Sequence, residues 1–412
     1  MVSKASHYSW PKGAALTGVG SQNVIGIPVD DQARLDCDAL EDILAGCLSQ
    51  CQPVYGVILT IGTTKHGAVD SISQVIAMRE RYRDMGLSFL IHADAAWGGY
   101  FTSMLVLDPE HTYNRDASDD PLMFVNPHTE RELRHLRFAN SVTVDPHKSG
   151  YIAFPAGGLC YRDGRLRHLL TWTSPVLGSP QEDVSRIGVY GVEGSKPGAP
   201  PVAAWMSHEV IGLHKGGYGL ILGQVVFNAI RMYAHWATMS IDHPELLVVP
   251  FVMLPNIDAE RRIVRDLVIT RTSKELSKDP RARMLVQALG PDLAVNAFAC
   301  NFRIDGKINQ DISEANLLNE RIYDRLSFSK LTDDLNNCKL ILMSSVFVQT
   351  EYRDCLTKFK RRLGLVGDAD LRVLVNVPMS PKVSEKEVEV SVIRNASTPA
   401  LHAFQVNTHR LS

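Results

Sequence analysis

Short apolar runs that alternate with longer helical patterns are the feature that most constrains the fold of this chain. The clearest example runs from residues 54–61 through a helical stretch at 71–85 into 87–96. A strand, a helix and a second strand in this order form a βαβ unit, in which the two strands are parallel. Further strands are predicted at 141–145 and 157–162. The sequence therefore predicts an α/β fold, in which the loops after the strands surround a ligand site.

The pattern changes after about Pro244. Before it, helices are predicted at 199–213 and 220–236, with HKGGYG as a turn-forming break between them, and the polar residues 108–132 predict a surface excursion. After it, strands within 295–304, 339–348 and 370–377 are separated by amphipathic helices. We therefore expect a large domain at residues 1–243 and a smaller C-terminal α+β domain at residues 244–412.

Composition narrows the class of partner. Lys plus Arg is 43 and Asp plus Glu is 45, a formal charge of -2, so no bulk positive charge attracts nucleic acid or an anionic membrane. No apolar run approaches the roughly 20 residues of a membrane span, and the first ten residues lack the apolar core of a signal peptide. We expect a cytoplasmic protein with a small-molecule ligand. The seven cysteines form no C-x-x-C pair and no metal spacing with histidine, which predicts buried thiols and no metal site.

Lys148 is the first candidate for chemistry. It lies in SVTVDPHKSG, directly after the strand at 141–145 and next to His147, so its amine is expected at the carboxyl end of the sheet. A partly desolvated lysine beside a second group that can be cationic is a better nucleophile toward an aldehyde, as in Schiff-base lysines. The alternative is a surface lysine at the end of a strand.

Asp94 is the second candidate, because in IHADAAWGGY a carboxylate follows a continuous apolar strand. Burying that charge costs several kcal/mol unless a cation faces it. A protonated pyridine nitrogen is such a cation, and the carboxylate that holds its proton lets pyridoxal phosphate act as an electron sink. An N-cap or a structural ion pair is the alternative for this residue.

Three further segments suit a ring or a phosphate. His7 in SHYSWPKGA could stack over an aromatic ring, and Thr60 belongs to the strand-end turn TIGTT, whose hydroxyls suit a ring oxygen, a phosphate or ordinary turn hydrogen bonds. Ser195 in GVEGSKPGAP could cap a helix whose free amides receive phosphate, or could be a plain N-cap. The motifs of nucleotide-binding proteins, zinc proteases and α/β-hydrolases are absent from the sequence.

Taken in this order, HYSW, TIGTT-x-x-GAVD, HADAAWGGY, DPHKSGY and EGSKPG resemble the group II pyridoxal-phosphate-dependent amino-acid decarboxylases. Within this family the chain is most similar to microbial L-tyrosine decarboxylases. The resemblance implies a fold-type I large domain like that of aspartate aminotransferase, N-terminally short relative to the family. It also implies that Lys148 forms the internal aldimine, that Asp94 pairs with the pyridine nitrogen and that His7 stacks on the ring, which makes these three the expected catalytic residues.

The remaining expected cofactor contacts follow from the same motifs. Thr60 and Ala96 would line the cofactor, Asp145 and His147 would stand beside the phosphate or the aldimine, and Ser195 would reach the phosphate. The implied reaction is decarboxylation of an aromatic L-amino acid, first of all L-tyrosine to tyramine and carbon dioxide. The implied assembly is a homodimer with its sites near the subunit interface.

The chain departs from the family pattern in ways that keep alternatives open. Only six residues precede His7, where family members carry a long segment, which leaves a truncated non-catalytic partner as one alternative. The family's mobile-loop tyrosine has no counterpart between Tyr161 and Tyr190, which leaves an aromatic aldehyde synthase as another. Phe154 stands where the tyrosine branch tends to have tyrosine, and an aspartate or glutamate decarboxylase is a third alternative.

Overall fold

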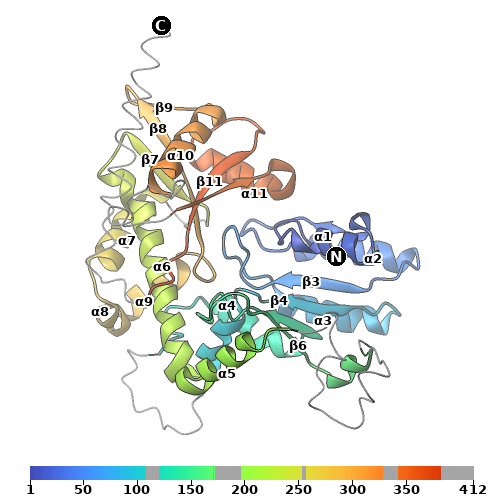
Figure 1. Cartoon of the computed structure of the whole chain (residues 1–412). Coiled ribbons are helices and arrows are strands. Elements are labelled where there is room, and N and C mark those ends of the chain that lie inside the picture. Colours follow the sequence, from blue (N-terminus) through green and yellow to red (C-terminus); the bar gives the residue numbers. More distant parts are fainter. Residues whose placement is uncertain (108–119, 170, 172–195, 253–256, 328–341, 382–412) are drawn as a thin grey trace.

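Two β-sheets organise the protein (Figure 1). The computed structural model describes residues 1–107, 120–169, 171, 196–252, 257–327 and 342–381. The first sheet has six strands in the order β2-β1-β3-β4-β5-β6, and the second has five, with β10-β11-β8-β7 in line and β9 paired to β8. The strands of the first sheet are β1 (Val2–Ser3), β2 (Gly26–Ile27), β3 (Gly56–Thr60), β4 (Leu90–Asp94), β5 (Ser141–Val144) and β6 (Gly158–Tyr161).

The predicted βαβ unit is present as β3, α3 (Ile72–Asp84) and β4. Strands β1 to β5 are parallel, and the register places Thr60 beside Asp94 and Asp94 beside Thr143. The strands expected at 141–145 and 157–162 are also confirmed as β5 and β6. Strand β6 runs antiparallel to β5, a direction that the sequence of one strand does not reveal.

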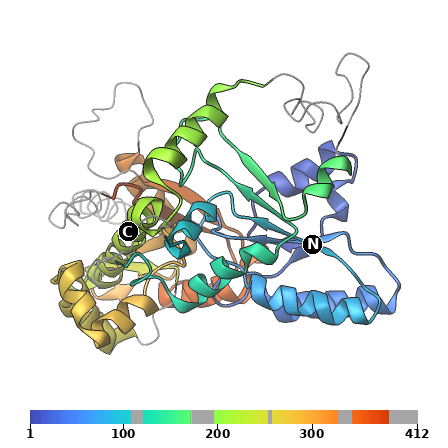
Figure 2. The ribbon, with the colours of Figure 1, turned by 90° about the horizontal axis from the view of Figure 1, so that it is seen from below.

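The two faces of the first sheet have different surroundings. Val57 and Leu59 of β3 and Ile91 and Ala93 of β4 are buried against α2 (Cys37–Ser49), α3 and α4 (Pro127–His135). The alternate residues point to the other face, as the period of two in a strand requires. That face is crossed by α1 (Ser9–Leu16), which buries none of its own residues (Figure 2). The helix-covered face is therefore the core, and the α1 face has room for a cavity.

The predicted surface excursion is wrong for much of the part that the structure describes, because residues 121–125 are buried. The run at 122–125 is buried, and Phe124 stacks on Phe227 at 4.7 Å between ring centroids. The Asn126 side chain then accepts a hydrogen bond from the Thr129 amide at the start of α4. The prediction failed because the polar stretch contains a short apolar run at 122–125 and, at Asn126, the N-cap of α4. Residues 108–119 lie outside the described part of the chain.

The cysteine prediction is only partly correct. Cys47, Cys300 and Cys355 are buried, as expected. Cys51 and Cys160 are exposed, the first at a φ of 52° in the turn after α2 and the second on β6. Cys338 lies outside the described residues. The count and spacing of the cysteines therefore do not reveal that one thiol lies at a turn and another on an edge strand.

A long buried helix lies beside both sheets. It is α6 (Leu220–Thr238), which follows α5 (Ala199–Ile211) and a five-residue π-helical turn, Lys215–Gly219. The predicted break is confirmed at Gly217, where a Cβ atom would lie 2.0 Å from the Ile211 carbonyl oxygen. Within the described residues no single helix is long and apolar enough to cross a membrane, although α5 and the following helix, bent by 83°, meet that test as a pair.

The second sheet is antiparallel and packs against α6 and two of the helices after it, α10 (Ile312–Leu326) and α11 (Gln349–Arg362). Its strands are β7 (Leu246–Pro250), β8 (Asn296–Ile304), β9 (Lys307–Ile308), β10 (Met343–Phe347) and β11 (Leu371–Asn376). Its helices are α7 (Ile257–Val264), α8 (Ser273–Lys278), α9 (Pro280–Ala288), α10 (Ile312–Leu326) and α11 (Gln349–Arg362). Three of the strands coincide with the predicted runs, while the domain boundary at residue 243 stays a prediction.

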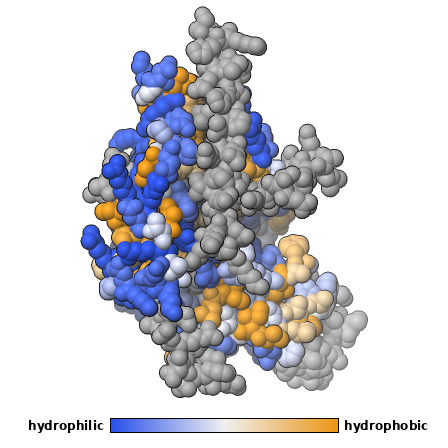
Figure 3. All heavy atoms as spheres, turned by 90° about the vertical axis from the view of Figure 1, so that its left-hand side faces the viewer, coloured by the Kyte–Doolittle hydropathy of each residue, from blue (hydrophilic) through white to orange (hydrophobic). Residues whose placement is uncertain are grey.

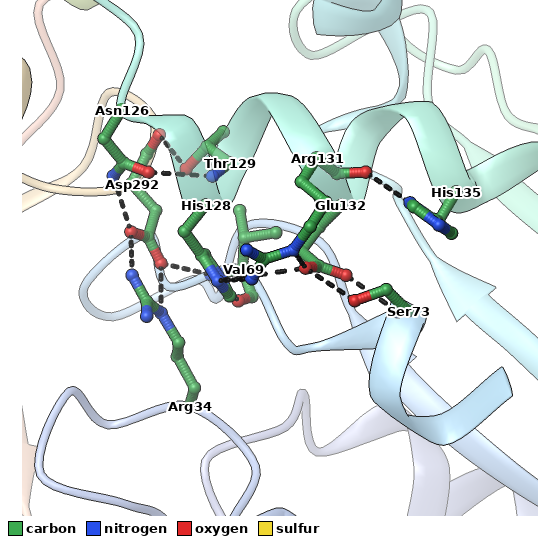
Figure 4. A network of polar contacts seen from close by, with 10 residues as sticks. All are labelled: Arg34, Val69, Ser73, Asn126, His128, Thr129, Arg131, Glu132, His135 and Asp292. Carbon is green, nitrogen blue, oxygen red and sulfur yellow. Dashed lines mark hydrogen bonds and ion pairs between the residues drawn. The ribbon is translucent and has the colours of Figure 1, made fainter. Parts of the chain in front are cut away.

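A buried carboxylate joins the segment before β8 to the first sheet (Figure 4). Asp292 accepts hydrogen bonds from Arg34 Nε at 2.8 Å, the Val69 amide at 2.8 Å and Asn126 Nδ2 at 3.0 Å. Burial opposes ionisation of this carboxyl, but the Arg34 guanidinium outweighs it and lowers the pKa of Asp292. The two halves of the molecule are therefore connected by a satisfied ion pair.

Candidate active site

The candidate site lies where three neighbouring parallel strands end. Thr60 is the last residue of β3, Asp94 is the last residue of β4, and Asp145 directly follows β5. The carboxyl ends of parallel strands in an open α/β sheet are where ligands bind. The sequence therefore brings a hydroxyl and two carboxylates together simply by ending these strands where it does.

Lys148 reaches this edge through a tight turn after β5. Its amide donates to the Asp145 carbonyl, and its Nζ lies 2.8 Å from Asp145 Oδ2. The lysine side chain is 40% exposed and that of Asp145 is 16% exposed, so the ion pair stands at the edge of solvent. Asp145 therefore holds the Lys148 amine in one place.

The turn that carries Lys148 is braced from behind. The Tyr218 hydroxyl, which is buried, donates to the Gly150 carbonyl at 2.7 Å, and Ser149 Oγ donates to the Trp97 carbonyl at 2.6 Å. Gly150 has no room for a side chain, because a Cβ atom would lie 2.6 Å from both the Pro146 carbonyl oxygen and a carbon of the Tyr100 ring. The position of Lys148 is thus set by packing as well as by Asp145.

Asp94 is 9% exposed and, among the residues that the structure describes, forms no ion pair. Its Oδ2 accepts a hydrogen bond from Trp10 Nε1 at 2.9 Å, and its Oδ1 lies 3.4 Å from the Ala96 amide. A buried carboxylate with a single good donor is expensive unless a cation approaches it. The predicted N-cap and ion-pair alternatives find no counterpart here in the described part of the chain.

These residues line one cavity of about 1120 Å³. Of the eight predicted site residues, six contribute to its wall: His7, Thr60, Asp94, Ala96, Asp145 and Lys148. His147 does not line it, because its ring bonds to the Ala156 carbonyl and packs edge-on against Phe154 at 4.8 Å. Ser195 lies outside the described residues, as does most of the segment between Tyr161 and Tyr190.

The cavity wall suits pyridoxal phosphate. Thr60 Oγ1 is buried without a hydrogen-bond partner among the described groups, and such an orphan costs about 1–3 kcal/mol unless a ligand satisfies it. An amine that can attack an aldehyde stands on the same wall as a buried carboxylate that can face a ring nitrogen. The donor set therefore fits the aldehyde and the ring of this cofactor.

Trp10 is the site residue that the sequence analysis missed. Its indole donates to Asp94, 84 residues away in the chain, and its ring packs edge-on against His92 at 5.2 Å between centroids. One signal was available, since Trp10 follows the predicted site residue His7 by only three residues in the chain. Thr143, also on the wall, could have been found from its alternation with Asp145 along β5.

Comparison with known proteins gives the same assignment as the geometry. Residues 1–113 match the family model described as the pyridoxal-dependent decarboxylase conserved domain. The predicted resemblance is confirmed, and Thr60, Asp94 and Ala96 lie within the matched residues.

Curated relatives extend the similarity over most of the chain. The L-tyrosine decarboxylase of Enterococcus faecium is 27% identical over 98% of this chain and 59% of its own length, and that of Enterococcus faecalis is 28% identical over 94% and 58%. The aspartate 1-decarboxylase of Aliivibrio fischeri is 26% identical over 64% of this chain and 44% of its own length. The chain therefore spans less than two thirds of the length of these relatives.

Solved structures confirm the fold-type I prediction. The rice (Oryza sativa) TDC structure with PLP and tryptamine superposes with a TM-score of 0.60 at 16% identity, over 97% of this chain and 62% of that one. At 16% identity this similarity establishes the fold and does not identify the substrate.

Proposed function

We propose that this chain forms part of a pyridoxal-phosphate-dependent amino-acid decarboxylase that carries its cofactor on Lys148. The observation that carries the proposal is the cavity in which Lys148 and Asp94 share one wall at the ends of adjacent strands. The match of residues 1–113 to the pyridoxal-dependent decarboxylase model supports it. When bound, pyridoxal phosphate supplies an electron-poor ring that accepts the electron pair left when the substrate carboxylate departs as carbon dioxide.

Lys148 and Asp145 transfer a proton at the amine to which the cofactor would attach, Lys148 Nζ. Nζ attacks an aldehyde carbon only as the neutral amine, so it must first lose a proton. Asp145 Oδ2, 2.8 Å away, is placed to accept that proton and to return it. The same carboxylate keeps the amine at the end of β5, where the braced turn holds it.

Asp94 and His7 contribute the wall groups that would meet the ring. Asp94 provides a buried negative charge that favours a protonated ring nitrogen, and His7 provides an imidazole on the cavity wall. The His7 ring is held by a hydrogen bond of 2.8 Å between its Nδ1 and Ser9 Oγ. These residues bind and orient the ring, while the electron-withdrawing chemistry belongs to the cofactor.

L-Tyrosine is the proposed substrate. The two Enterococcus relatives support it, and so does the cavity wall, on which Trp10, Trp97 and Ile58 offer aromatic and apolar surface. Aspartate is the second candidate because of the Aliivibrio relative. A substrate with an acidic side chain needs a cation, however, and Lys148 is the only Lys or Arg among the described residues of the wall.

The proposed assembly is a homodimer that pairs across α5. This helix buries none of its residues and exposes Val202, Trp205, Met206 and Val210 to at least 54% each. Figure 3 shows apolar residues gathered in the lower part of the molecule, at the level of α5 in Figure 1. Apolar surface of this kind marks an interface. Light scattering is expected to give a Val210→Glu variant the mass of a monomer. A variant that keeps the mass of a dimer would contradict pairing across α5.

Decarboxylation is tested with the cofactor-loaded protein and 1-carboxyl-labelled amino acids. We expect release of labelled carbon dioxide from L-tyrosine and at most a slow release from L-aspartate, with none from a Lys148→Arg variant. No release from tyrosine, phenylalanine, tryptophan, dihydroxyphenylalanine, aspartate or glutamate would refute the proposal. Hydrogen peroxide and ammonia formed in step with carbon dioxide would instead indicate the aldehyde synthase alternative.

A further inference from the structure

The contact between Trp10 and Asp94 is unusual in its surroundings. Trp10 is the second residue of α1, and its Nε1 lies 2.9 Å from Asp94 Oδ2. Within the described part of the chain, Trp10 is the side chain that donates to this carboxylate. The other donor, the Ala96 amide, is 3.4 Å from Oδ1, beyond the usual range of a strong N–H···O bond.

An aspartate held by one donor depends on that donor for its orientation. The terminal torsion of an aspartate side chain is broad and roughly two-fold, so the carboxylate plane turns easily when nothing holds it. The indole nitrogen is a donor only and cannot exchange roles with its partner. The Trp10 hydrogen bond therefore fixes Oδ2 and leaves Oδ1 without a side-chain partner among the described residues.

Trp10 is itself supported by the strands beneath it. Its ring packs on the edge of His92, which lies two residues before Asp94 and so on the same face of β4. The His92 ring is held from β5 by Ser141 Oγ at 2.8 Å and Thr143 Oγ1 at 3.1 Å. The donor to Asp94 thus rests on a ring that two hydroxyl groups hold in place.

We infer that Trp10 is a positioning residue for the cofactor, which keeps the Asp94 carboxylate in the one orientation that receives the ring nitrogen. The inference rests on the proposed function and deepens it, since it names the residue through which α1 contributes to cofactor binding. It concerns affinity for pyridoxal phosphate and requires no turnover.

A double-mutant cycle tests whether Trp10 acts through Asp94. The dissociation constant of pyridoxal phosphate is measured by absorbance for the wild type, Trp10→Phe, Asp94→Ala and the double variant. Because Trp10→Phe removes the side-chain donor to a carboxylate, it is expected to weaken binding by about 10-fold or more in the wild-type background. In the Asp94→Ala background the same change should alter binding less than about twofold. Equal effects in the two backgrounds would overturn the inference.

Trp236→Phe is the matched control. Trp236 is a buried indole whose Nε1 donates to Asn376 Oδ1 at 3.0 Å in the second sheet, so the variant loses the same type of bond away from the cavity. We expect it to lower the melting temperature and to leave the dissociation constant unchanged. Weakening of cofactor binding as large as that of Trp10→Phe would show a general loosening and overturn the inference.

Indole ¹⁵N–¹H spectra test the contact without the cofactor. The Trp10 signal is identified by its loss in Trp10→Phe, and we expect it to shift in Asp94→Ala while the Trp236 signal stays. A Trp10 signal that does not shift in Asp94→Ala would show that the hydrogen bond is absent and would overturn the inference. A cofactor adduct on Lys148 with unchanged affinity in Trp10→Phe would overturn the inference alone, whereas no cofactor uptake by the wild type would overturn the proposed function and the inference together.

Discussion

His66 gives the protein a pH-dependent stability that can be calculated from its surroundings. It lies in the loop after β3, is 1% exposed and is enclosed by the rings of Phe251, Phe347 and Tyr352 at 5.4–5.9 Å between centroids. Its Nε2 donates to the Ala33 carbonyl at 3.0 Å, which leaves Nδ1 to accept from the Tyr352 hydroxyl at 3.4 Å. In this neutral tautomer both ring nitrogens have a hydrogen-bond partner. A second proton, on Nδ1, would prevent that atom from accepting the bond from Tyr352.

Burial lowers the pKa of His66 from 6.5 to about 4. Between these values the unfolded chain binds a proton that the folded protein does not, so the free energy of unfolding falls as the pH falls. The difference of about 2.5 pKa values corresponds to about 3 kcal/mol, fully lost only below pH 4. Denaturant unfolding of the wild type and of His66→Gln from pH 7 to 4 measures it.

The difference between the two proteins isolates this histidine from every other group that titrates. The wild type is expected to lose about 3 kcal/mol more than His66→Gln over this range, because glutamine keeps an amide donor near the Ala33 carbonyl and does not titrate. His168→Gln, a change at an exposed histidine, should follow the wild type. Parallel curves for the wild type and His66→Gln would refute the reasoning.

Two further substitutions test the lysine turn and the buried ion pair. Gly150→Ala should prevent the cofactor adduct on Lys148, because its Cβ atom would lie 2.6 Å from the Pro146 carbonyl oxygen. Mass spectrometry of the reduced adduct measures this, while an unchanged far-ultraviolet circular dichroism spectrum shows that the variant is folded. Gly164→Ala, which has open space around its Cβ atom, is the control. Arg34→Met should lower the free energy of unfolding by about 3–5 kcal/mol, because it leaves the Asp292 charge buried and unpaired. Arg81→Met, which breaks an exposed pair, should cost below about 1 kcal/mol, and equal losses in denaturant unfolding would contradict this account.

The parts of the fold that were predicted are those with a local period. The unit β3-α3-β4 carries continuous apolar strands around a helical pattern, and the break before α6 carries three glycines. Strands β1 and β2 have two residues each, too few for any period to appear. Helix α2 was missed although Asp36 caps it and Leu40 and Leu44 recur on its buried face, a signal that the sequence did contain.

The site was predictable as far as strand ends determine it. Asp94 and Lys148 follow apolar strands, so their convergence follows from the parallel order of the sheet. The Asp145–Lys148 ion pair joins two residues only three positions apart in the chain, so it could have been inferred from the sequence. The bond from Trp10 to Asp94 could not, because it depends on how α1 crosses the open face of the sheet.

The central claim is that Lys148 carries the cofactor, and covalent capture tests it most directly. The folded chain is incubated with pyridoxal phosphate and reduced with borohydride, which fixes the cofactor to the amine that holds it, and the modified peptide is sequenced by mass spectrometry. The account predicts one stoichiometric adduct on Lys148, absent from Lys148→Arg. A folded wild-type protein with no adduct, or with the adduct on other lysines, would contradict it.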